Sequence, residues 1–135
     1  MNLDSLLGQP HATFHDAVIE RIEVDYLRKV AVIHLQIDEW NPDASSLEDR
    51  ERKIPGTLTV SGLLYFVMEP PDENYPFQAN DGLWISEDEI TPRTPGVSAR
   101  LPWNLPEEAF VHRLFVNEWN SFIYLAGTHA EFVWK

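Results

Sequence analysis

The amino-acid sequence predicts a mainly β (β-rich α+β) fold, with an antiparallel sheet curled into a sandwich or half-barrel and a few short helical turns. Residues 14–39 alternate apolar and polar side chains around a short polar connection, which is the pattern of a β-hairpin. Further apolar runs rich in β-branched and aromatic residues follow, and the total is about seven or eight strands. No strands alternate with long helices, so a doubly wound fold is disfavoured.

The first third of the chain predicts one helical turn and two strands. Residues 2–7 place three leucines on one side of a short helix, which Gly8 ends. In residues 18–26 the even positions lie on one face and the odd positions on the other, which suits a strand with one buried face. Residues 27–29 connect it to a return strand over residues 30–37, whose odd positions from Ala31 to Ile37 form an apolar face.

The middle of the chain predicts a loop and then one long strand. Residues 41–53 are polar, with a brief helix expected within residues 45–50. Residues 57–68 are apolar on both faces, which is typical of a central or covered strand. Gly62 within this run indicates either a β-bulge or a close backbone approach.

Residues 70–106 hold seven of the ten prolines, so continuous regular structure is not expected there. Asn80-Asp81-Gly82 predicts a hairpin turn between short strands at residues 77–79 and 83–85. The remaining expectations are a one-turn helix with a capping box at residues 86–89, which Pro92 would end, and an edge strand over residues 97–101.

Residues 106–119 fit either a helix or a strand. Glu107 in a capping position favours a helix, whereas the β-branched and aromatic residues that follow favour a strand. A helical turn at residues 106–109 followed by a strand is the preferred interpretation. The expected elements after it are a turn at residues 119–121, a strand at 122–126, a turn at 127–128 and a final strand at 130–134.

Length and composition indicate one domain over residues 1–135 with an ordered core, since 44% of the residues are hydrophobic. There are no cysteines, which excludes disulfides and thiolate zinc sites. The first residues lack a signal-peptide pattern and no apolar run is long enough to span a membrane, so a soluble, cytoplasmic protein is expected.

The net charge of −12 bears on the class of partner. From Asp38 to Glu89 there are 13 acidic and three basic residues. Phosphate backbones would be repelled, so nucleic acid is disfavoured, whereas a basic protein or a cation would be attracted. The alternative is that the charge only maintains solubility.

Aromatic residues next to these acids predict a partner-binding surface, because exposed aromatics rimmed by charge are typical of binding hot spots. The competing interpretation is that the aromatics anchor loops to the core and the acids are solvated. The candidate residues are Trp40, Glu69, Asp72, Glu73, Tyr75, Trp84, Glu87 and Asp88.

No catalytic, cofactor or nucleotide motif is present, and none of these sites is expected. His11, His15 and Asp16 could clamp a metal ion on a helix, but on a strand the two histidines would lie about 13 Å apart, so a structural turn or cap at His15-Asp16 is favoured. The abundant carboxylates keep a second alternative, which is a hydrolytic or ligand-binding cleft formed by residues 69, 72 and 73 or by residues 87–89.

Residues 14–17, followed by Ile19, Ile22, Asp25 and Tyr26, then the strand at 30–37 and Gly-Thr-Leu-Thr-Val-Ser-Gly at 56–62, resemble small bacterial β-rich proteins of unassigned role. Some of those are similar to immunity proteins of polymorphic toxin systems. The resemblance covers about the first half of the chain and implies a small, acidic, antitoxin-like binder. Three functions therefore remain open: a non-enzymatic acidic protein-binding module, a ligand-binding or hydrolytic β-domain, and a structural homodimer joined through a strand edge.

Overall fold

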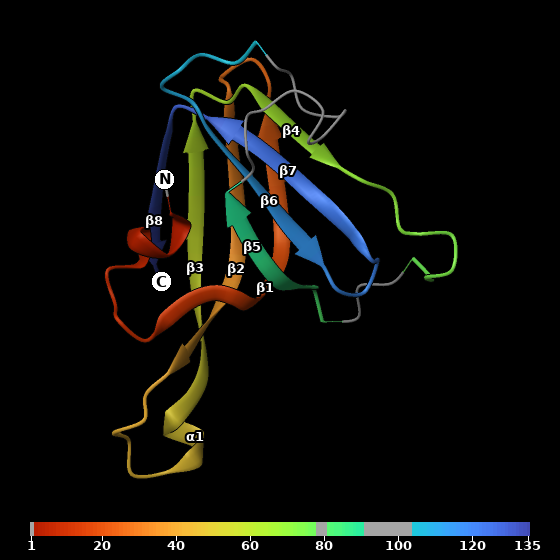
Figure 1. Cartoon of the computed structure of the whole chain (residues 1–135). Coiled ribbons are helices and arrows are strands. Elements are labelled where there is room, and N and C mark those ends of the chain that lie inside the picture. The colour runs from red at the N-terminus through yellow and green to blue at the C-terminus, as the bar shows by residue number, and fades with distance from the viewer. Residues whose placement is uncertain (1, 78–80, 91–103) are drawn as a thin grey trace.

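In the part of the chain that the structure describes, eight strands form a single antiparallel sheet that curls without closing into a barrel (Figure 1). The computed structural model describes residues 2–77, 81–90 and 104–135. The strand order is β4-β7-β6-β5-β1-β2-β3-β8, so β4 and β8 are the end strands. The mainly β class is confirmed, in its half-barrel form. The elements are η1 (Leu3–Leu7), β1 (Ala12–Asp25), β2 (Val30–Trp40), α1 (Leu47–Arg50), β3 (Glu51–Ser61), β4 (Tyr65–Met68), β5 (Leu83–Ile90), β6 (Phe110–Val116), β7 (Ser121–Gly127) and β8 (His129–Trp134).

The core lies on the inner face of the curled sheet, and β2 shows why. Its odd positions from Ala31 to Ile37 are at most 1% exposed, as the alternation predicts. The 3-10 helix η1 adds Leu3 and Leu7 to this core and ends at Gly8, also as predicted. The indole nitrogen of Trp134 donates to the Leu7 carbonyl at 3.0 Å, which fastens η1 to β8. No helix in the described ranges is both long and apolar enough to cross a membrane.

Strand β1 differs from the prediction because two irregularities interrupt its pairing with β2. Thr13 pairs with Asp38 and Val18 with Gln36, so four residues of β1 stand opposite one residue of β2. A second irregularity lies between Ile19 and Arg21. The assignment of all even positions to one face was therefore wrong: Ile19 is buried, whereas the even position before it, Val18, lines a surface cleft.

The single strand predicted over residues 57–68 is in fact two strands. Gly62 adopts a φ of +58°, and β3 ends just before it. The chain then crosses to the opposite end of the sheet, where β4 pairs with β7. A Cβ at Gly62 would lie 1.9 Å from Oγ1 of Thr128, so the predicted close approach is confirmed. Since Thr128 N also donates to the Ser61 carbonyl at 3.2 Å, the β3–β4 and β7–β8 connections touch.

The expected loop at residues 41–53 ends earlier than predicted, because β3 begins at Glu51. The strand before the loop, predicted over residues 30–37, extends to Trp40. The predicted short helix is present as α1. Figure 1 shows the two strands continuing beyond the body of the sheet as a ribbon that carries α1 near its tip.

Strand β5 replaces two elements predicted in the proline-rich region. The capping box at residues 86–89 predicted a helix, which was wrong: the segment is extended and pairs with β6, for example Glu89 with Arg113. Leu83 at the start of β5 pairs with Ile19 of β1, while the segment of the capping box pairs with β6, and this pairing overrides the local helix signal. The predicted hairpin includes residues 78–80, and the predicted edge strand residues 97–101; both lie outside the described residues.

The preferred interpretation of the C-terminal third is confirmed. Ala109 N donates to the Pro106 carbonyl at 3.1 Å, which closes the turn before β6. Strands β6 and β7 then follow as an antiparallel pair, joined by a turn at residues 117–120 in which Asn120 has a φ of +48°. The last strand, β8, pairs with β3 at the other end of the sheet.

Candidate functional site

An open cleft of about 480 Å³ lies on the outer face of the sheet, where β1, β3, β5 and the β6–β7 turn meet. It combines an aromatic ring with four carboxylates and one ammonium group. The lining residues are Asp16, Val18, Glu51, Lys53, Asp81, Gly82, Trp84 and Glu118.

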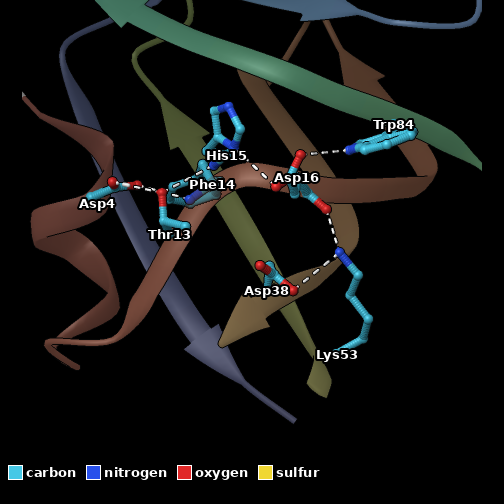
Figure 2. A network of polar contacts seen from close by, with 8 residues as sticks. All are labelled: Asp4, Thr13, Phe14, His15, Asp16, Asp38, Lys53 and Trp84. Atoms are coloured by element: carbon cyan, nitrogen blue, oxygen red, sulfur yellow. Dashed lines mark hydrogen bonds and ion pairs between the residues drawn. The ribbon is translucent and has the colours of Figure 1, made fainter. Parts of the chain in front are cut away.

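Asp16 is the hub of the cleft because the bulge in β1 turns it out of the ladder. Its φ of +66° is left-handed, a conformation that Asp tolerates better than most residues. Its carboxylate contacts the indole nitrogen of Trp84 at 3.0 Å and Nδ1 of His15 at 3.1 Å (Figure 2). Its backbone carbonyl accepts a hydrogen bond from Lys53.

Lys53 reaches this carbonyl across β2. On the way its ammonium lies 3.4 Å from Oδ1 of Asp38, the residue opposite it on β2 (Figure 2). The side chain of Asp38 is only 15% exposed, so it needs this cation close by. The positive charge of Lys53 is therefore largely compensated within the fold and reduces the negative potential of the cleft only weakly.

Trp84 is held at its backbone and at its ring. Its backbone N–H donates to both carboxylate oxygens of Glu118 at 2.8 Å, while the indole N–H is taken by Asp16. The residue nevertheless remains 45% exposed. The sheet therefore presents a fixed indole ring that is accessible to solvent.

Two of the four carboxylates have no such structural task. Glu51 and Asp81 make no ion pair and no side-chain hydrogen bond with any residue in the described ranges. Trp40 stands directly opposite Glu51 in the β2–β3 ladder, so the two side chains share a face, and Trp40 is 47% exposed. A second accessible indole thus lies beside the acidic cleft.

The base of the bulge is anchored from η1. Oδ1 of Asp4 accepts the Phe14 backbone N–H at 2.8 Å, and its Oδ2 accepts the Thr13 hydroxyl at 2.9 Å (Figure 2). The first bond satisfies a backbone N–H within the stretch of irregular pairing, and the second ties the neighbouring side chain to the same carboxylate. They fix the position from which Asp16 projects.

The structure separates the residues that the sequence grouped as one partner-binding surface. Trp84 lines the cleft and Trp40 adjoins it. Glu69 and Asp72 have structural tasks in another region: Oε1 of Glu69 accepts the Phe122 backbone N–H at 2.8 Å, and Oδ1 of Asp72 accepts that of Asn74 at 3.0 Å. Glu73 and Tyr75 are exposed on the same loop.

Glu87 and Asp88 lie in β5, with backbones opposite Phe115 and Leu114 of β6. They belong to a strand and not to the predicted helical turn. This places them on the same strand as Trp84, further along the chain.

The sequence missed most of the cleft. Glu51, Lys53, Asp81 and Glu118 carry no local signal that distinguishes them from solvated surface charges. Asp16 was singled out only with His11 and His15 as a metal clamp. The structure places His15 and Asp16 in the bulge of β1 and not in the predicted turn or cap, and their side chains pair at 3.1 Å. No group of three metal-ligating side chains occurs among the described residues.

Comparison with known proteins adds information on the fold only. No protein-family model and no curated protein matches the chain. A similar solved structure is the crystal structure of an uncharacterized protein from Neisseria gonorrhoeae. It matches with a TM-score of 0.51 and 12% sequence identity, over 90% of this chain and 93% of the other. At this identity the likeness concerns the fold and carries no function across.

Proposed function

We propose that this chain is a non-enzymatic binding module whose acidic cleft holds basic side chains of a partner protein. The observation that carries the proposal is the accessible ring of Trp84, fixed between Asp16 and Glu118 beside two carboxylates that have no partner among the described residues. A guanidinium or ammonium group placed over an indole face gains about 0.5–2 kcal/mol, depending on its desolvation. Glu51 and Asp81 would then pair with the same cation.

The overall charge supports the same class of partner. A net charge of −12 attracts a basic protein over long range and raises its rate of association. The resemblance to immunity proteins favours a toxin domain as this partner.

Binding is favoured over hydrolysis because two of the cleft's carboxylates are already engaged in hydrogen bonds. Asp16 and Glu118 already accept hydrogen bonds from Trp84, so both act as positioning groups for the ring. A small organic cation is a second candidate ligand, because 480 Å³ lies within the range of small-molecule sites.

A direct test uses two blocked peptides, one of several arginines and one of the same number of citrullines, which keep the shape of arginine but lack its charge. The arginine peptide should bind and perturb the tryptophan fluorescence, and its affinity should fall with salt. The double variant Glu51→Gln/Asp81→Asn should weaken this binding at least tenfold. Equal binding of both peptides would contradict the proposal.

The matched control is Glu48→Gln/Glu131→Gln, which removes the same charge from exposed positions that do not line the cleft. If the control weakens binding as much as the cleft variant, the net charge and not the cleft attracts the peptide. The cleft double variant then serves as the negative bait in a lysate capture that seeks the natural partner.

A further inference from the structure

We propose that the partner's binding segment carries an apolar side chain close to its basic residues, and that this side chain enters a second hollow beside the acidic cleft. This inference rests on the function proposed above and names the chemistry of the partner more closely. The second hollow, called here the apolar groove, has a volume of about 770 Å³. Its lining residues are Ile19, Glu20, Arg21, Ile22, Met68, Phe77, Asp81, Gly82, Leu83 and Trp119.

The walls of the apolar groove come from the inner face of the sheet. Ile19 and Leu83 are paired across β1 and β5 and are almost fully buried. Met68, at the end of β4, contributes an adaptable thioether side chain that is 39% exposed. The groove therefore offers apolar surface continuous with the core.

Phe77 is the most unusual residue of the apolar groove. It is 78% exposed, yet its ring stacks on that of Trp119 with centroids 4.9 Å apart and an interplanar angle of 22°. A large exposed aromatic ring supported by a buried one provides an ordered contact surface at little further cost in conformational entropy. This is the arrangement found at the centre of protein-binding hot spots.

The apolar groove and the acidic cleft share one wall. Asp81 and Gly82, at the start of β5, line both hollows. Gly82 packs directly on β1, where a Cβ would stand 2.6 Å from the Ile19 carbonyl oxygen, so the backbone itself separates the two hollows. A partner segment that runs past Asp81 and Gly82 would meet both hollows.

The charges at the rim favour a basic segment over other apolar occupants. Asp81 contributes a carboxylate to both hollows, and Arg21 is already paired with Glu23. The partner that fits both hollows is thus an amphipathic basic segment, with an apolar anchor next to arginine or lysine.

The test uses three blocked probe peptides with the same flanks: leucine between arginines, serine between arginines, and leucine between citrullines. The first should bind the wild-type chain about tenfold more tightly than the second, because burial of one leucine is worth about a factor of ten in affinity. Phe77→Ala should abolish the preference for leucine over serine. Glu51→Gln should weaken both arginine peptides equally, because Glu51 lines only the cleft.

Leu27→Ala is the matched control, since Leu27 is 98% exposed and lines neither hollow. Equal binding of the leucine and serine peptides, or an unchanged preference in Phe77→Ala, would overturn the inference and leave the proposed function standing. Failure of both arginine peptides to bind would overturn the two together. Concentration-dependent dimers in sedimentation that Phe77→Ala abolishes would assign the groove to a second copy and also overturn the inference.

Discussion

The indole N–H of Trp84 donates a hydrogen bond to Oδ1 of Asp16 at 3.0 Å, and the two residues are 68 positions apart in the chain. One lies in β5 and the other in the bulge of β1. The bond fixes the orientation of an accessible aromatic ring relative to the carboxylates around it, so the geometry of the acidic cleft depends on it.

Trp84→Phe removes the indole donor and keeps an aromatic ring. Because a hydrogen bond contributes about 0.5–1.5 kcal/mol net, we expect a loss of roughly 1 kcal/mol or less in the free energy of unfolding, measured by urea denaturation. Affinity for the arginine peptide should fall more than it does in Trp40→Phe. Equal losses in the two variants would show that the Asp16 bond does not orient the ring.

Lys53→Met should destabilise the fold by about 1–3 kcal/mol, because Asp38 would lose its nearby cation while remaining largely enclosed. Adding Asp38→Asn removes the uncompensated charge, so the double variant should regain most of the lost stability. Denaturation of the two single variants and the double variant gives the coupling energy. Lys29→Met is the control, since Lys29 is exposed and forms no ion pair with the described residues. Additive effects would mean that Lys53 does not compensate Asp38.

Gly56→Ala should cost about 1–3 kcal/mol through overpacking. A Cβ at this position would lie 2.1 Å from Cζ of Phe132 on the neighbouring strand β8. Phe132→Leu is smaller at the contact, so Gly56→Ala should cost less in that background than in the wild type. The thermal midpoints of the four chains provide the measurement, and an equal cost in both backgrounds would exclude Phe132 as the cause.

Asp4→Ala should lower the unfolding free energy by about 1–3 kcal/mol, because the Phe14 N–H and the Thr13 hydroxyl both lose their acceptor. Thr13→Val in the Asp4→Ala background should cost less than Thr13→Val alone. The bulge would also lose its support from η1, so hydrogen exchange at Phe14 and its neighbours should become faster. Unchanged exchange there would mean that β1 holds the bulge without η1.

The elements that the sequence predicted are those whose cause is local. The alternation within β2 depends on neighbouring residues, and so do the end of η1 at Gly8 and the turn before β6. The capping box in β5 is also a local signal, but β6 supplies backbone partners that a single turn of helix does not replace. The break at Gly62 was visible as a glycine, whereas its partner Thr128 was not.

The candidate site was less predictable because its contacts join distant parts of the chain. Lys53 and Asp16 are 37 residues apart, and Trp84 and Glu118 are 34 apart. Trp84 was chosen because it is an aromatic residue near acidic ones, and it lies in the cleft. Glu69 was chosen on the same grounds and instead accepts a backbone N–H at the start of β7, a role that only the tertiary structure assigns.

The contact between Gly62 and Thr128 joins the two connections that link the ends of the open sheet. Because the β3–β4 and β7–β8 connections are in contact at that corner, a movement of β4 or of β8 would disturb both connections. Met68 lies at the opposite end of β4, where it lines the apolar groove. A small change in the curl of the sheet would therefore alter the width of the apolar groove without breaking a strand pair. The groove could then accept apolar side chains of different size.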